Sequence, residues 1–262
     1  MPDTPTAERA NLTAAPLQAS RGAPAEQLPP LVLLPGHMSS ATTWEHQCRP
    51  LRGRRTVIVP DSHYGLESIE QMARAIAAGL PERFDLVSWS MGGYIALELY
   101  PLVRDRIRTL TLISTSARAE NPAALIRRGE FLRTVQAVGL RAAYIASLDQ
   151  MIKEPQHIEP QFKDRIIAEA MRFGEAVLFS QIKAMIGRHD QRAMLPQIDC
   201  PTLVVVGTED DIVPSEYTEE LARAIPRAQV HVVCGTGHCA PWERADEINQ
   251  VLEAFWHAKQ AG

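Results

Sequence analysis

Short, largely apolar runs recur along the chain and predict buried strands. They lie at residues 31–34, 56–59, 84–87, 109–113, 202–206 and 229–233. A run of this kind is typical of a strand that is buried on both faces. Helix-like patterns occupy most of the intervals, at residues 69–80, 91–100, 215–224 and 245–257. The alternation predicts an α/β fold, in which helices flank a mainly parallel sheet of about six strands.

One long interval, residues 116–190, contains helical patterns but no strand-like run. The helical stretches lie near residues 122–138, 141–151, 161–173 and 175–187. Because the sheet resumes afterwards, we expect these helices to form a lid over the strand ends, with an independent helical bundle as the alternative. Functional loops of such sheets gather at the carboxyl ends of the strands, where a lid shapes the pocket. The predicted core then consists of residues 29–115 and 191–262.

The beginning of the chain has a different composition from the rest. Residues 1–28 are rich in Ala, Pro and Thr and lack periodicity, which predicts a flexible extension. They have neither the basic start nor the apolar stretch of a signal peptide. No run of about 18 apolar residues occurs in the chain, so we expect no membrane span and a cytoplasmic protein.

Composition and charge limit the classes of binding partner that we expect. Hydrophobic residues make up 45% and charged residues 22% of the chain, as in soluble globular proteins. The 27 basic and 31 acidic side chains give a net charge of −4, which argues against nucleic-acid binding. No metal-ligand or disulfide spacing relates the four cysteines, and we expect reduced, mostly buried thiols at Cys48, Cys200, Cys234 and Cys239.

Three polar residues, each on a loop that follows a predicted strand, carry the candidate chemistry. Ser90 stands in the segment VSWSMGG at residues 87–93, between a strand and a helix, where a tight turn exposes a serine hydroxyl. Asp210 lies in GTEDDIVP at residues 207–214, where a carboxylate can fix the tautomer of a histidine. His238 ends the glycine-rich segment CGTGH after the last predicted strand, and imidazole is the natural base near neutral pH.

These segments resemble motifs of the α/β-hydrolase family, which carries Ser, Asp and His in this order. The resemblance covers roughly residues 31–257 and implies that Ser90 is the nucleophile, His238 the base and Asp210 the acid that orients it. The family's spacing after the strand favours Asp210 over its neighbour Asp211.

The segment LPGHM at residues 34–38 is similar to the family's oxyanion turn. This similarity implies that the backbone N–H groups of His37 and Met91 stabilise the oxyanion. Two features depart from the family pattern. Ser88 stands where a glycine is usual, and nothing before residue 31 resembles the two antiparallel strands that often open this fold.

The resemblance further implies a serine esterase, similar to small bacterial carboxylesterases, that forms an acyl-enzyme on a small-molecule ester-like substrate. An enol-lactone or C–C bond hydrolase with the same triad, and a ligand receptor of the same fold, are the alternatives. Family members with an aspartate nucleophile, such as haloalkane dehalogenases, are disfavoured by the serine at position 90. No cofactor, metal, nucleic acid or membrane is implied, and nothing indicates the oligomeric state.

Overall fold

A computed structural model describes residues 28–259 of the chain. Its strands form one sheet in the spatial order β2-β1-β3-β4-β5-β6, and every neighbouring pair is parallel. The prediction of about six parallel strands in an α/β fold is confirmed. The strands are β1 (Leu31–Leu34), β2 (Val57–Ile58), β3 (Phe84–Trp89), β4 (Ile107–Ile113), β5 (Thr202–Gly207) and β6 (Ala228–Val233).

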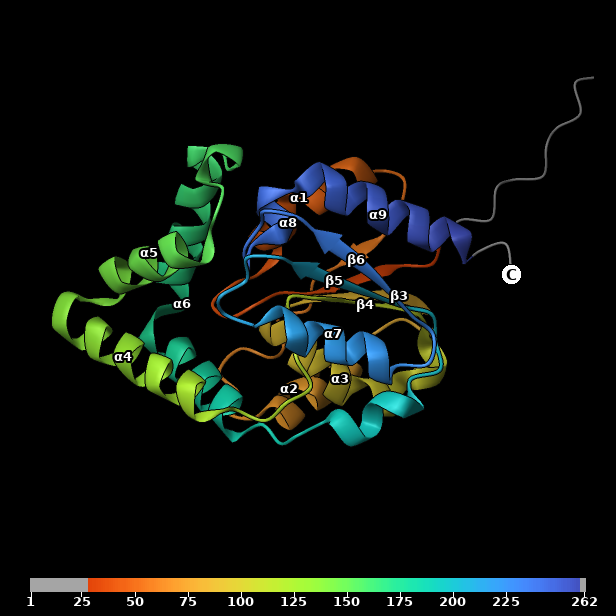
Figure 1. Ribbon diagram of the computed structural model, residues 1–262, viewed down its shortest axis with the longest axis horizontal. Coiled ribbons are helices and arrows are strands. Elements are labelled where there is room, and N and C mark those ends of the chain that lie inside the picture. Colours follow the sequence, from red (N-terminus) through yellow and green to blue (C-terminus); the bar gives the residue numbers. More distant parts are fainter. Residues whose placement is uncertain (1–27, 260–262) are drawn as a thin grey trace, which may run out of the picture.

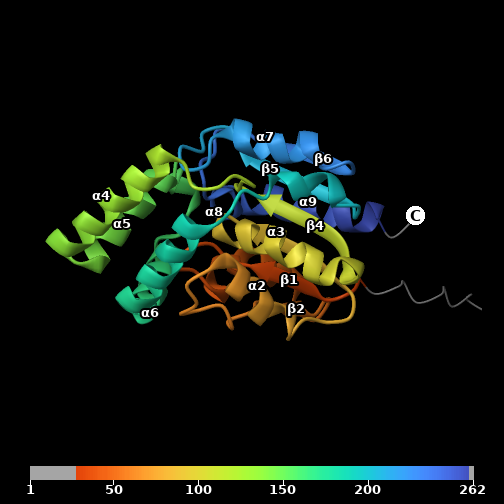
Figure 2. The same ribbon diagram turned by 90° about the horizontal axis from the view of Figure 1, so that it is seen from below.

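Helices cover both faces of the sheet (Figure 1, Figure 2). On one face lie α1 (Glu45–Cys48), α8 (Ala240–Glu243) and α9 (Ala245–Ala258). On the other lie α2 (Ile69–Ala77), α3 (Met91–Val103) and α7 (Ser215–Ala224). This double cover explains why every residue of β1 and β3 is buried, without the alternation of a strand that has one exposed face. Short 3-10 helices cover Ala41–Trp44, Arg49–Leu51, Arg104–Arg106, Pro155–His157 and Arg192–Gln197.

The two edge strands differ from the sequence prediction. β2 has two residues in place of the four expected. At the opposite edge, β6 is not buried on both faces as its apolar run predicts, because Val230 and Val232 are 47% and 48% exposed. An edge strand lacks a neighbour on one side, so its side chains receive less cover than those of the central strands.

Three helices lie between β4 and β5, as predicted. They are α4 (Pro122–Val138), α5 (Leu140–Met151) and α6 (Pro160–Gly187), and we refer to residues 122–187 as the insertion. Figure 1 shows the insertion to one side of the core, beyond the carboxyl ends of the strands. Asn121 caps α4 by accepting the Ala124 N–H at 2.9 Å, and Gly174, with φ 68°, divides α6 into the two helical stretches that were expected.

Other expectations concern the termini, the thiols and the membrane. The extension predicted at residues 1–28 lies, apart from Leu28, outside the described residues. Cys200 and Cys239 are buried and Cys48 is partly buried, but Cys234 is exposed, so the prediction of mostly buried thiols is wrong there. Within residues 28–259, no helix combines the length and the apolar character that crossing a bilayer requires.

Candidate active site

Ser90 occupies the turn between β3 and α3. Its backbone angles are φ 55° and ψ −120°, a region that costs a residue with a side chain roughly 1–3 kcal/mol. Hydrogen bonds hold the turn in this conformation: the Ser90 N–H donates to the Ile113 carbonyl at 3.0 Å, and the Thr115 hydroxyl donates to the Ser90 carbonyl at 2.8 Å. The strained turn places the hydroxyl at the carboxyl end of the sheet, as in a nucleophile elbow.

The residues two positions before and after Ser90, Ser88 and Gly92, are small. A Cβ atom at Gly92 would lie 2.3 Å from the Leu34 carbonyl oxygen, so α3 could not pack against β1 with any side chain at this position. On the other side, Ser88 is buried and donates its hydroxyl to the Thr111 carbonyl at 3.1 Å. This hydrogen bond explains how a serine replaces the usual glycine without leaving a buried polar group unpaired.

The structure brings Ser90, Asp210 and His238 together. The Nε2 atom of His238 lies 2.8 Å from the Ser90 Oγ atom. The Nδ1 atom lies 2.9 Å and 3.1 Å from the two carboxylate oxygens of Asp210. We assign the proton to Nδ1, because a carboxylate only accepts and the serine hydroxyl then donates to Nε2. This arrangement prepares Nε2 to take the serine proton.

Asp210 and its neighbour Asp211 have different surroundings. The side chain of Asp210 is 1% exposed, and its Oδ1 atom also accepts the N–H groups of Ile212 and Val213, each at 2.9 Å. Asp211 is 76% exposed and pairs with Lys153 at 2.5 Å. The carboxylate that contacts His238 in the structure is therefore that of Asp210, and its orienting role stays a prediction.

The loop that carries His238 is fastened to the insertion. The His238 N–H donates to the Met151 carbonyl at 3.2 Å, and the Trp89 indole donates to the His238 carbonyl at 2.8 Å. Glu243, which is buried, accepts the N–H groups of Lys153 and Glu154 at 2.8 Å and 2.7 Å. Sequence reasoning missed Glu243, since nothing in the pattern relates it to a segment 90 residues earlier.

The predicted oxyanion turn lies against the nucleophile. A Cβ atom at Gly36 would be only 3.4 Å from the Cβ atom of Ser90, so the turn touches the elbow. Met91 is the first residue of α3, and its N–H therefore has no acceptor within the helix. Among residues 28–259, no hydrogen bond uses the His37 N–H. Both groups keep a donor for a ligand, and their role in an oxyanion hole stays a prediction.

The residue after His37 is fixed by the insertion. Met38 has φ 52°, and its buried N–H donates to the Oε1 atom of Gln181 on α6 at 2.8 Å. The imidazole of His37 also contacts the insertion through the Leu178 carbonyl. Burial, aided by the positive charge of Arg128, lowers the pKa of His37 to about 3, so this ring is neutral near neutral pH. Gln181 is a second residue that the sequence did not reveal.

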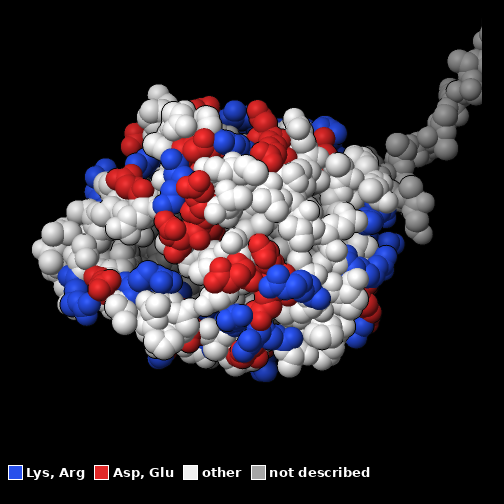
Figure 3. Space-filling model, in the orientation of Figure 1, with Lys and Arg blue, Asp and Glu red and all other residues white. Residues whose placement is uncertain are grey.

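A cavity of about 450 Å³ opens at Ser90 between the insertion and the core. This volume is within the range of small-molecule sites. The insertion contributes several large apolar side chains to its wall, namely Phe131, Tyr144, Met151, Ile182 and Met185. Figure 3 shows the surface hollowed between the insertion and the core. The wall also holds several charged side chains, so the pocket is not simply apolar.

One group of residues in the described part of the chain has the spacing of a metal site. The ligand atoms of Glu70, Glu98 and His189 all lie within 4.8 Å of one another. His189 faces Glu70 through Nδ1 at 3.0 Å and Glu98 through Nε2 at 3.5 Å. The ring therefore bridges two carboxylates with opposite nitrogens, and none of the three residues lines the cavity at Ser90.

Comparisons with known proteins identify a family. Residues 31–251 match the model of the alpha/beta hydrolase family. A dihydrolipoyllysine-residue acetyltransferase component of an acetoin cleaving system, from Pseudomonas putida, is 28% identical over 86% of this chain, which spans 63% of that relative's length. A pimeloyl-[acyl-carrier protein] methyl ester esterase from Vibrio atlanticus is 25% identical over 87% of this chain and 95% of its own.

Solved structures show the same relationship. A thermophilic esterase from Thermogutta terrifontis is 28% identical, with a TM-score of 0.78 over 88% of this chain and 90% of the esterase. Because the family model spans most of the sequence and the sheet order agrees with it, the chain belongs to the alpha/beta hydrolase family.

Proposed function

We propose that this protein is a serine esterase that hydrolyses small to medium carboxylic esters through an acyl-enzyme. The observation that carries the proposal is the continuous hydrogen-bonded chain from the Ser90 hydroxyl through His238 to Asp210, at the wall of a cavity of about 450 Å³. Esterases among the relatives support the reaction class.

The first half of the reaction acylates the serine. His238 removes the Ser90 proton through Nε2 while Oγ attacks the ester carbonyl carbon. The backbone N–H groups of His37 and Met91 donate to the oxygen that becomes negatively charged. When this tetrahedral intermediate collapses, His238 returns the proton to the alcohol oxygen, and the alcohol leaves.

The second half restores the enzyme. A water molecule gives a proton to the same His238 nitrogen and attacks the acyl carbon, so the acid leaves and Ser90 recovers its hydrogen. In both halves His238 becomes positively charged for a short time. The buried carboxylate of Asp210 stabilises that charge, and its two backbone hydrogen bonds keep the oxygen in place.

In this proposal, the insertion acts as the lid that covers the site. It supplies part of the cavity wall, and it contacts both the predicted oxyanion turn and the loop that carries His238. In the mechanism, such a cover keeps bulk water from the charged intermediates.

A labelling experiment with two substrates tests the proposal. A fluorophosphonate should label the protein once, at Ser90, and p-nitrophenyl butyrate should be hydrolysed. Ser90→Ala should abolish labelling and lower kcat by a factor of about 10⁴ to 10⁶. A folded protein that neither reacts with the fluorophosphonate nor turns over the ester would contradict the proposal and favour a receptor of this fold.

A second candidate, the hydrolysis of a polar lactone, is favoured by the charged side chains of the cavity, among them Arg118, Arg128 and Glu120. It uses the same three residues and the same acyl-enzyme, but the alcohol stays attached to the acid. Comparing kcat/KM for a lactone and for an open-chain ester of the same acid distinguishes the two.

A further inference from the structure

The cavity at Ser90 differs in charge from the protein as a whole. The chain has more acidic than basic side chains, 31 against 27. The cavity wall instead contains four arginines and two glutamates. These are Arg118, Arg127, Arg128 and Arg188, with Glu120 and Glu130. Figure 3 shows basic side chains along the lower border of the hollow. The excess of basic side chains at the cavity wall therefore does not follow from the charge of the chain as a whole.

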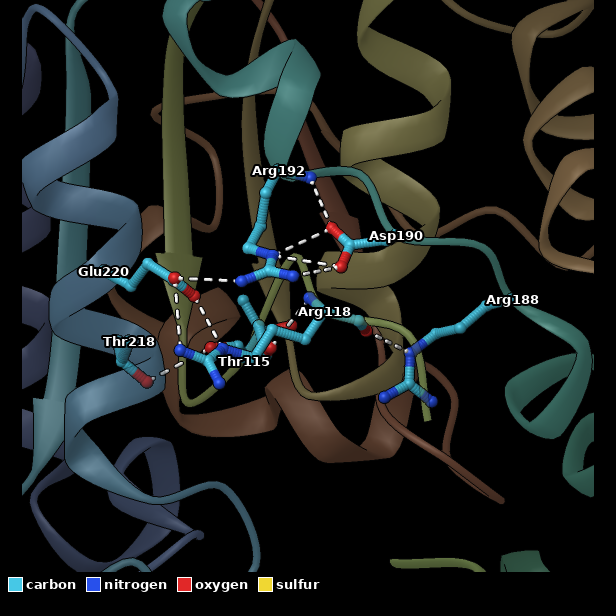
Figure 4. A network of polar contacts seen from close by, with 8 residues as sticks. Thr115, Arg118, Arg188, Asp190, Arg192, Thr218 and Glu220 are labelled. Atoms are coloured by element: carbon cyan, nitrogen blue, oxygen red, sulfur yellow. Dashed lines mark hydrogen bonds and ion pairs between the residues drawn. The ribbon is translucent and has the colours of Figure 1, made fainter. Parts of the chain in front are cut away.

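Two of the arginines are held rigidly and already have their partners. Arg118 binds Glu220 through two nitrogens, at 2.8 Å and 3.1 Å, and lies 4.2 Å above the ring of Tyr217. The guanidinium of Arg188 is 6% exposed and donates from Nε to the Arg118 carbonyl at 3.0 Å. Figure 4 shows this network, which joins the end of the insertion to α7 and the loop after β4. The side chains of Arg118 and Arg188 are therefore held in place by these contacts.

The other two arginines are not fully neutralised. Glu120, 5% exposed, accepts from Arg128 at 2.6 Å and from Arg188 at 2.9 Å, so one carboxylate serves two guanidinium groups. Burial opposes ionisation of Glu120, but the two arginines outweigh it and lower the pKa of this carboxyl. Arg127 has no acidic partner within residues 28–259, and its Nη2 atom lies 3.5 Å from the Ile212 carbonyl. Glu130 offsets part of this charge from an exposed position on α4.

Arg127, Arg128 and Ser90 line the same cavity. Arg128 is close enough to act electrostatically on His37, the residue of the oxyanion turn. A guanidinium offers parallel N–H groups that match the two oxygens of a carboxylate. In a partly enclosed cavity, such a pair is stronger than on an open surface because water screens it less.

We propose that the natural substrate carries a second, free carboxylate, which Arg127 and Arg128 bind while the ester carbonyl lies at Ser90. The substrate class is thus a monoester or lactone of a dicarboxylic acid. This inference rests on the proposed function, because it assigns a substrate class to the same site. If the two arginines only fasten α4 to the core, their replacement changes stability without changing the preference between substrates.

The test compares two p-nitrophenyl esters of similar length, the neutral butyrate and the anionic hemiglutarate. In 20 mM salt, we expect kcat/KM to be at least about tenfold higher for the hemiglutarate, mostly through a lower KM. Arg127→Gln, which breaks no ion pair, and Arg128→Gln should each reduce the ratio of the two kcat/KM values, and 0.5 M salt should reduce it in the wild type. Arg133→Gln, an exposed change on the same helix outside the cavity, should leave the ratio unaltered.

A direct binding measurement keeps this inference separate from the proposed function. Glutarate should bind to Ser90→Ala in calorimetry, and about tenfold more weakly when Arg127→Gln and Arg128→Gln are added. Equal hydrolysis of the two esters, or a preference for the hemiglutarate that survives both arginine changes, would overturn the inference while the esterase stands. If neither ester is hydrolysed, the esterase proposal fails, and glutarate binding still decides whether the arginines form a carboxylate site.

Discussion

Gln181 on the insertion should control the rate of the chemical step although it does not line the cavity. Its Oε1 atom accepts the Met38 N–H at 2.8 Å, and both residues are fully buried. Replacing Gln181 with methionine, which has a similar length but no acceptor, leaves that N–H unpaired. An unpaired buried donor costs about 1–3 kcal/mol, which the turn can recover only by rotating toward another acceptor.

Such a rotation would displace the N–H of His37, which is the neighbouring residue. Loss of one oxyanion donor lowers kcat by a factor of about 10² to 10³, and a displaced donor should cost less. We therefore expect Gln181→Met to lower kcat by about 10- to 100-fold, with KM within about threefold of the wild type. Gln181→Glu keeps an oxygen at this position and should recover most of kcat.

The assay is the hydrolysis of p-nitrophenyl butyrate, with the free energy of unfolding measured in urea for each variant. A purely structural role for Gln181 predicts a less stable protein with an unchanged kcat. A role of Gln181 in the chemical step is refuted if Gln181→Met shows that result, or if KM rises while kcat stays constant. Equal kcat for the glutamate and methionine variants would also exclude the acceptor as the cause.

Three further changes follow from the structure. Asp210→Asn should lower kcat by about 10⁴-fold with little change in KM, because an amide no longer stabilises the charged ring and its tautomer; steady-state kinetics measures this. Glu243→Ala should cost roughly 3 kcal/mol, since two partly buried N–H groups lose a buried, charged acceptor, and should lower Tm by roughly 6–12 °C in a thermal scan. Burial lowers the pKa of His63 to about 4, although the negative charge of Asp61 acts to raise it. In the unfolded chain, the same ring takes up a proton near pH 6.5. The free energy of unfolding should therefore fall as the pH drops from about 6.5 toward 4. Between pH 7.5 and pH 5, His63→Leu should make this fall smaller by about 2 kcal/mol, which urea titrations at the two pH values measure.

Local patterns in the sequence were sufficient for most of the fold. The bounds of α4 agree with the prediction because Asn121 and Pro122 mark its start and Gly139 its end, and these signals act within a few residues. The central strands agree because helices cover both of their faces. At β6 the strand was predicted but its burial on both faces was not confirmed. Whether a strand lies at an edge depends on the order of strands in the sheet, which apolar runs do not encode.

The meeting of Ser90, Asp210 and His238 could be predicted because each stands at a fixed spacing from a glycine turn. The residues that hold them could not be found in this way. Gln181 is 143 positions from Met38, and Glu243 is about 90 positions from the N–H groups it binds. A glutamine or glutamate in a helix has the same local pattern whether it is buried or exposed. Only the folded chain shows which of them meets an unpaired donor.

These contacts give the insertion two tasks, which are combined in α5 and α6. It forms much of the cavity wall, where changes in sequence would alter the choice of substrate. The same segment holds the oxyanion turn through Gln181 and the loop of His238 through the Met151 carbonyl. A change of specificity that shifts α5 or α6 therefore also moves the groups proposed to be catalytic, whereas a change on α4, which carries Arg127 and Arg128, touches neither contact. Substrate preference should accordingly be easiest to alter through α4, with the least loss in kcat.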